Sequence, residues 1–153
     1  MVSRQKSKKR YGEEEENIKR LTTELNLKEQ VMFFKDITND LKNSLLVKSN
    51  IFVMPSRSKY FGAEFEGLGL VYLEAASHGM PTLVGSSGGA PETVIPGQSG
   101  FVVGDKKAII EGVLYFIENP DKLTVFGNKN RENIENNFSL QVFSEKFEKA
   151  LSQ

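Results

Sequence analysis

Four short runs of strand-forming residues alternate with stretches of helical periodicity, and this alternation limits the choice of fold more than any other feature. The runs are Val31–Phe34, Ile51–Met54, Thr82–Val84 and Phe101–Val103. They lack the polar alternation of a half-exposed strand, so they are typical of a parallel sheet covered on both faces. The sequence therefore predicts an α/β fold, with a doubly wound parallel sheet and helices on both faces.

The stretches between and after these runs have the periodicity and end signals of helices. Thr38 or Asn39 is a candidate cap for one of them, and Gly79 and Pro81 are typical of the end of another. On the capped helix we expect three leucines to face inward: Leu41, Leu45 and Leu46. The predicted helices cover residues 13–26, 38–49, 68–78 and, with a break near 119–120, 106 to the C-terminus.

Composition excludes several classes of protein. None of the 153 residues is cysteine, which excludes disulfides and fits a cytoplasmic protein. No apolar run approaches the roughly 20 residues of a membrane-spanning helix. The formal net charge is zero, so nucleic acid is not an expected partner.

The charges are uneven at the start of the chain, where a basic stretch runs from Arg4 to Arg10. We interpret residues 1–12 as a solvated basic tail, either native or added to the protein. The alternative is contact with an anionic membrane surface.

Two glycine-containing loops occupy the places where ligands bind in sheets of this kind. Ligands lie outside the carboxyl ends of parallel strands, where loops lead into helix N-termini. The loops are Pro55–Gly69 and Gly85–Glu92. Both follow a predicted strand, so both are candidate binding loops.

The first of these loops ends in residues suited to a sugar diphosphate. Gly67 and Gly69 allow close approach of the backbone, and free amides at the following helix start would attract a diphosphate. Glu66 and Glu74 could each accept two hydrogen bonds from a vicinal diol. The plainer alternative is that Glu66 is a helix-start charge and Glu74 a solvated surface residue.

The run EGLGLVYLEAASHGMPTLVGSSGGAPETV resembles the retaining glycosyltransferases of family 4, which have the GT-B fold. Their pattern is two Glu separated by seven residues, then a GG-x-PE motif and a G-x-x-G before a strand. Here these are Glu66 and Glu74, Gly88–Glu92 and Gly97–Gly100. The resemblance runs from about Glu13 to the C-terminus, and the loop before Glu66 looks like that of bacterial phosphatidylinositol mannoside mannosyltransferases.

This resemblance implies that residues 13–153 form the Rossmann-like, C-terminal half of a GT-B enzyme, which binds the nucleotide-diphosphate sugar. Glu66 would contact the transferred sugar as the catalytic residue, and Glu74 would contact the ribose. The amides of Gly67 to Leu70 would hold the diphosphate, Phe34 and Lys35 would lie at the base, and Ser87 and Gly88 would border the cleft. The implied donor-binding residues are Glu66, Gly67, Leu68, Gly69, Leu70, Glu74, Phe34, Lys35, Ser87 and Gly88.

The resemblance also implies GDP-mannose as the favoured donor and no metal or other cofactor, since the chain has no D-x-D motif. Arg57 and Lys59 could help to neutralise the phosphates or could be solvated. His78, before the helix-ending Gly79, is expected to be structural. The stripe Phe143, Phe147, Ala150 and Leu151 is expected to pack in the core, or to be exposed where another domain covers it.

Some features of the family have no counterpart here. Its diphosphate-binding Arg and Lys precede the first strand of this sequence, so we expect the first strand–helix unit to be lacking. Its catalytic His and acceptor site belong to an N-terminal domain, which a longer polypeptide or a partner would supply. We therefore expect this chain to be inactive alone and the full-length enzyme to be cytoplasmic, with a peripheral association at the inner face of the membrane.

The functional prediction is retaining transfer of a hexosyl group, with mannose favoured, to a glycan or lipid-linked acceptor. The alternative is a non-catalytic module that binds nucleotide sugars or regulates such an enzyme. A dinucleotide-dependent dehydrogenase is disfavoured, because no G-x-G-x-x-G follows a first strand.

Overall fold

The computed structural model describes residues 3–56 and 67–152, which belong to two units, Met1–Asn39 and Asp40–Gln153. The first unit contains helix α1, Ser3–Glu24. The predicted helix over 13–26 is confirmed, but it begins earlier, so the backbone of the basic stretch is helical. Lys and Arg are good helix formers, and no Gly or Pro interrupts the chain before Gly12.

The predicted strand over Val31–Phe34 is wrong. These residues have no regular secondary structure, and Met32, Phe33 and Phe34 are all exposed. The amide of Val31 donates back to the carbonyl of Leu27 at 3.0 Å, in the turn that follows α1. A strand needs a neighbour for its backbone hydrogen bonds, and none of the described strands pairs with this segment.

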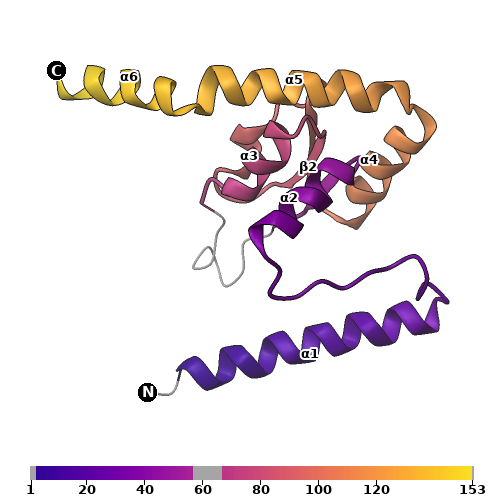
Figure 1. Ribbon diagram of the computed structural model, residues 1–153. Coiled ribbons are helices and arrows are strands. Elements are labelled where there is room, and N and C mark those ends of the chain that lie inside the picture. The colour runs from indigo at the N-terminus through magenta and orange to yellow at the C-terminus, as the bar shows by residue number, and fades with distance from the viewer. Residues whose placement is uncertain (1–2, 57–66, 153) are drawn as a thin grey trace. The chain divides into compact units, whose positions relative to one another are not determined.

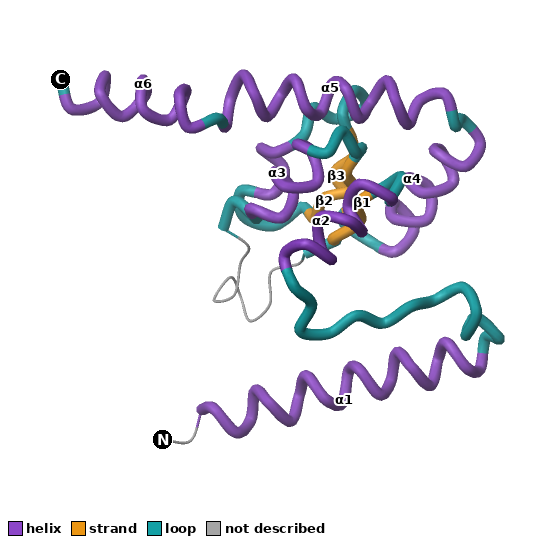
Figure 2. The backbone as a smooth tube through the Cα atoms, in the orientation of Figure 1, coloured by secondary structure: helices purple, strands orange, loops and turns teal. Residues whose placement is uncertain are grey.

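The second unit is built on three parallel strands, β1 (Phe52–Met54), β2 (Thr82–Gly85) and β3 (Gly100–Val103), in the order β1-β2-β3. Figure 2 shows them in orange among the helices. All three coincide with predicted strands. The register aligns Met54 with Val84 and Val84 with Val102, so the strands end at one edge of the sheet.

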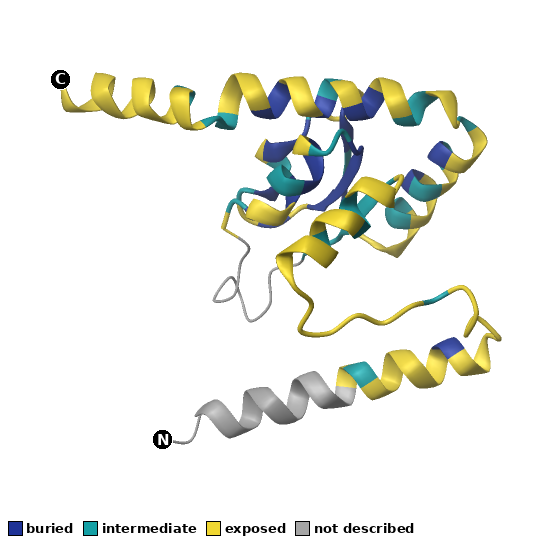
Figure 3. Ribbon diagram, in the orientation of Figure 1, coloured by how far each residue is buried: buried dark blue, intermediate teal, exposed yellow. Residues whose placement is uncertain are grey.

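Helices cover both faces of this sheet, as predicted. On one face Tyr72 of α3 packs with Val84, and on the other Phe116 packs with Leu83. The dark blue of Figure 3 marks this buried core. The elements of the second unit in addition to the strands are α2 (Asn39–Lys48), α3 (Leu70–Ser77), the 3-10 turn η1 (Ala90–Thr93), α4 (Lys106–Glu118), α5 (Asp121–Phe138) and α6 (Leu140–Leu151).

The predicted inward face of α2 is only partly correct. Leu45 and Leu46 are half-buried, whereas Leu41 is 40% exposed. No residue of α2 is fully buried. The helix therefore lies at the margin of the core.

Helix α5 is fastened to the backbone of the sheet and of α3 by polar side chains. Asn130 donates from Nδ2 to the carbonyl of Met80 at 2.8 Å, and Arg131 donates from Nε to the carbonyl of Ser77 at 3.1 Å. Gly127 allows this approach, because a Cβ there would lie only 1.9 Å from the carbonyl oxygen of Gly79. These contacts of α5 thus hold the end of α3 and the start of β2 in place.

Helix α6 follows α5 with a single residue between them, and Figure 1 shows it extending beyond the rest of the second unit. The side chains of Phe143, Phe147 and Leu151 are 64%, 55% and 73% exposed, and the two rings stack with centroids 6.1 Å apart. Of the two expectations for this stripe, packing in the core is therefore wrong and exposure agrees with the structure, in which no described element covers it. Within residues 3–56 and 67–152, no helix has both the length and the apolar character needed to cross a membrane.

The close approach of α5 to Gly79 makes a prediction about stability. Helix propensity alone would make Gly127→Ala stabilising by about 1 kcal/mol. We expect it instead to lower the free energy of unfolding by about 1–3 kcal/mol, because the new methyl group meets backbone. Urea unfolding would measure this, with Asn128→Ala at the next, exposed position as the control. If both variants gained stability, the packing of α5 would be contradicted.

Candidate functional site

The described parts of the two predicted binding loops meet at the carboxyl edge of the sheet. The amide of Gly89 donates to the carbonyl of Gly67 with an N–O distance of 2.7 Å. A Cβ on Gly89 would lie 2.8 Å from that same oxygen, so a side chain would separate the loops. Glycine is therefore required here by the approach of one backbone to another.

Helix α3 begins at this junction. Gly69 precedes it with φ 72° and ψ 71°, a left-handed conformation that favours glycine. The first turn of a helix has amides without intrahelical acceptors and carries the positive end of the helix dipole. The chain thus places the amides of Leu70 and Val71 beside two glycine-containing loops, an arrangement suited to an anion.

Tyr72 attaches this helix to the end of β1. Its side chain is completely buried, and its hydroxyl donates to the carbonyl of Met54 at 2.7 Å. The same hydroxyl lies 3.2 Å from Oγ of Ser56, and the ring packs edge-on against Phe52. A buried phenol that bonds a strand end fixes the position of the helix start relative to the sheet.

Glu74 lies one turn after the first residue of α3, and its carboxylate is ion-paired. Its carboxylate oxygens Oε1 and Oε2 accept hydrogen bonds from Nζ of Lys42 at 3.0 and 2.9 Å. The two side chains are 41% and 35% exposed, respectively. In the sequence nothing distinguishes Lys42 from the other surface lysines of a polar helix, so its pairing with Glu74 could not be predicted.

His78 closes α3. Its Nδ1 lies 2.8 Å from the carbonyl oxygen of Glu74, and because a carbonyl only accepts, Nδ1 carries the hydrogen. Oγ of Ser77 donates to the same carbonyl at 2.7 Å. Both side chains satisfy the backbone at the end of the helix, which is the structural role expected for His78.

Of the other residues predicted in the two loops, three are described by the structure and three are not. Ser87 is 7% exposed and lies in the loop after β2, next to Gly88, whose φ is 61°. Leu68 is half-buried between Gly67 and Gly69. Glu66, Arg57 and Lys59 lie outside the described residues.

Phe34 and Lys35, predicted to lie at the base, belong to the first unit. The ring of Phe34 is 49% exposed. Nζ of Lys35 lies 3.2 Å from Oε2 of Glu15, and Lys19 donates to Oε1 of the same carboxylate at 2.8 Å. Hydrogen bonds from Lys19 first and from Lys35 second hold the pKa of the Glu15 carboxyl below its ordinary value.

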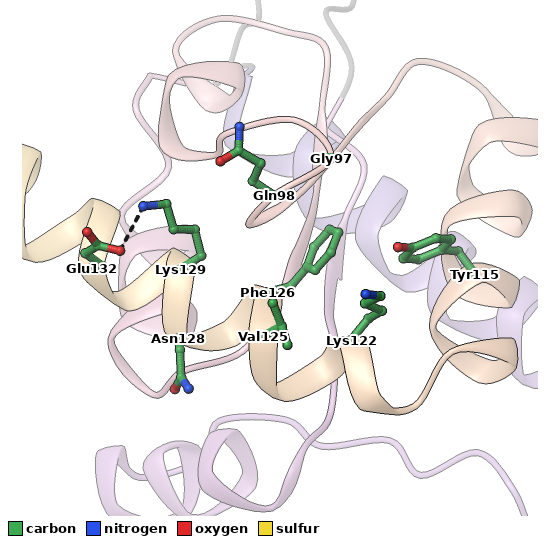
Figure 4. A pocket seen from close by; sticks show the side chains of 9 residues that line it. All are labelled: Gly97, Gln98, Tyr115, Lys122, Val125, Phe126, Asn128, Lys129 and Glu132. Carbon is green, nitrogen blue, oxygen red and sulfur yellow. Dashed lines mark hydrogen bonds and ion pairs between the residues drawn. The ribbon is translucent and has the colours of Figure 1, made fainter.

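A separate hollow of about 630 Å³ lies along α5, where Phe126 and Tyr115 supply aromatic walls (Figure 4). Lys129 also lines it, and its Nζ reaches toward Glu132, with which it is paired at 2.9 Å. None of the residues predicted to bind the donor lines this hollow. Its lining residues are Gly97, Gln98, Tyr115, Lys122, Val125, Phe126, Asn128, Lys129 and Glu132.

Comparison with known proteins agrees with the resemblance seen in the sequence. A family model described as "Glycosyl transferases group 1" matches residues 11–133. A GDP-mannose-dependent alpha-(1-6)-phosphatidylinositol monomannoside mannosyltransferase of Mycolicibacterium smegmatis is 37% identical over 114 residues, which are 73% of this chain and 30% of that protein. A GDP-mannose-dependent monoacylated alpha-(1-6)-phosphatidylinositol monomannoside mannosyltransferase of Corynebacterium glutamicum is 33% identical over 136 residues, which are 88% and 35% of the two chains.

Solved structures have the same fold. The sucrose-phosphate synthase of Thermosynechococcus elongatus matches 92% of this chain with 34% of its own, at 26% identity and a TM-score of 0.75. The Anabaena protein HepE, solved in complex with UDP, matches 93% with 38% of its own, at 21% identity and a TM-score of 0.77. The chain spans about a third of the length of the curated relatives it matches.

The buried hydroxyl of Tyr72 supports a prediction about how α3 is held. Tyr72→Phe should lower the free energy of unfolding by about 0.5–1.5 kcal/mol, because the hydrogen bond to the carbonyl of Met54 is lost. Tyr115→Phe, in a half-buried ring on the other face, is the matched control and should change it by less than about 0.5 kcal/mol. Equal unfolding midpoints for the two variants would contradict the anchoring role.

Proposed function

Since the chain belongs to the group 1 glycosyl transferases, we propose that it binds the nucleotide-diphosphate sugar from which such an enzyme transfers a hexosyl group. The favoured donor is GDP-mannose, and transfer proceeds with retention at the anomeric carbon. The acceptor is a glycan or a lipid-linked sugar, held by an N-terminal domain outside this chain. The chain supplies the donor-binding half and transfers nothing by itself.

The observation that carries this proposal is the junction of the Gly67 and Gly89 loops at the start of α3. The N–O distance of 2.7 Å leaves no room for a side chain between Gly67 and Gly89. A diphosphate placed there would meet the first amides of α3 and the positive end of its dipole. Binding by amides and cations needs no metal ion, so the proposed reaction is metal-independent.

Glu74 is assigned to the ribose of the donor. It lies one turn beyond the proposed diphosphate position, and its carboxylate accepts hydrogen bonds of the kind that hydroxyl groups donate. Glu66 is assigned to the transferred sugar and acts on the reacting centre. Phe34 and Lys35 are assigned to the base, and Ser87 and Gly88 to the border of the cleft.

The choice of GDP-mannose draws on the relatives. Both mycobacterial and corynebacterial relatives are described as GDP-mannose-dependent mannosyltransferases, at 37% and 33% identity. The names of these relatives give phosphatidylinositol monomannosides as their acceptors, which supports a lipid-linked acceptor in the proposal. The full-length enzyme would then work at the cytoplasmic face of a membrane.

Thermal unfolding with GDP, UDP, ADP and GDP-mannose tests donor binding by this chain. A ligand at about 100 times its dissociation constant should add roughly 2.7 kcal/mol, which raises the midpoint by about 5–10 °C. Glu74→Ala should remove most of this rise, because the ribose loses its acceptor. The matched control is Glu111→Ala, an exposed glutamate of α4.

Two results would contradict the proposal. One is a cooperatively folded sample whose midpoint does not move with any of the four ligands. The other is a rise in Glu74→Ala as large as in the wild-type chain and in Glu111→Ala, which would contradict the assignment of Glu74 to the ribose.

A further inference from the structure

Lys42 is the residue that the structure adds to the proposed donor site. Its Nζ lies 3.0 and 2.9 Å from the two carboxylate oxygens of Glu74, although the residues are 32 positions apart on α2 and α3. We propose that Lys42 is a positioning residue for donor binding, which holds the Glu74 carboxylate in place to accept the ribose hydroxyls. The inference rests on the proposed function, because it needs a nucleotide at Glu74.

The ion pair leaves the carboxylate able to bind a diol. An ionised carboxylate has about four lone-pair sites, two on each oxygen. The Lys42 ammonium uses one site on each oxygen of Glu74. One site on each oxygen remains, and the two hydroxyls of a ribose supply one donor for each.

The exposure of the pair favours a role in binding over a role in stability. The side chains of Lys42 and Glu74 are 35% and 41% exposed, so both reach the solvent from which a ligand arrives. Ion pairs this exposed contribute little to the free energy of unfolding. They can still restrict a side chain to one orientation, and a group ordered before binding loses less entropy when its ligand arrives.

The backbone that carries Glu74 is itself held in place, so orienting the carboxylate also fixes its position. The helix that carries Glu74 is fixed to β1 through the buried Tyr72 hydroxyl, and to α5 through Arg131. Two contacts therefore hold the backbone of α3, and only the side-chain torsions of Glu74 remain free to vary. The ion pair with Lys42, which lies on α2, restricts those torsions.

Lys42 also has a second, separable effect. It offsets the negative charge of Glu74, which would otherwise repel a diphosphate. Charge compensation of this kind acts on every nucleoside diphosphate equally. Positioning acts only on ligands with a ribose diol, so comparison of ribose with 2′-deoxyribose ligands distinguishes the two effects.

The test is a set of calorimetric titrations with GDP, UDP and ADP and their 2′-deoxy counterparts. Lys42→Met removes the charge and keeps much of the aliphatic stem, and Lys42→Arg retains a donor to both oxygens. Lys48→Met removes an exposed lysine from the last turn of the same helix and is the matched control. Unfolding midpoints of all variants confirm that each is folded.

We expect the wild-type chain and Lys48→Met to bind the ribose ligand about tenfold more tightly than its 2′-deoxy counterpart. In Lys42→Met the affinity for the ribose ligand should fall about tenfold. The preference for that ligand over its 2′-deoxy counterpart should shrink below about threefold. Lys42→Arg should restore part of the preference.

The outcomes distinguish the inference from the function on which it rests. A wild-type chain that binds no nucleoside diphosphate overturns both. If the wild type binds and prefers ribose while Lys42→Met keeps the full preference, only the role of Lys42 is overturned. If Lys42→Met lost the same affinity for ribose and 2′-deoxyribose ligands, positioning would likewise be overturned. Charge compensation would then be the only effect of Lys42.

Discussion

Parallel pairing of β1, β2 and β3 is the constraint on which the candidate site depends. Because the three strands run in one direction, with Met54, Val84 and Val102 aligned at or next to their ends, the segments that follow β1 and β2 leave the sheet at the same edge. That shared edge brings Gly67 and Gly89 to a backbone contact of 2.7 Å, although they are 22 residues apart in the sequence. An antiparallel arrangement would send these loops to opposite edges.

Helix α3 begins at this edge and carries the proposed ligand-binding groups. Its start is set by the left-handed Gly69 and by the Tyr72 hydroxyl on the end of β1. Its end is held by α5, through Arg131 on the carbonyl of Ser77. A single short helix of eight residues therefore presents both free amides and, one turn later, the carboxylate of Glu74. The proposed binding of a nucleotide sugar therefore depends on the fixed position of α3.

The sequence allowed the strands of the second unit to be predicted, because their apolar runs are buried in the sheet core. The same reasoning failed for Val31–Phe34, where Met32, Phe33 and Phe34 are exposed and with which none of the described strands pairs. Composition indicates that a segment can form a strand, but only a neighbouring strand makes it one. Lys42 could not be predicted either, since its pairing with Glu74 arises from the packing of two helices. The roles of Glu66 and of Phe34 and Lys35 remain predictions.

Amide chemical shifts are the most direct test of whether a nucleotide sugar binds where α3 begins. Spectra of the ¹⁵N-labelled chain would be recorded as GDP-mannose is added, with each backbone amide assigned. If the nucleotide sugar binds there, the largest shifts should fall on residues 67–71 and 87–89, with small changes around the α5 hollow at Phe126. Shifts concentrated at that hollow, with the amides at the start of α3 unchanged, would contradict binding at α3.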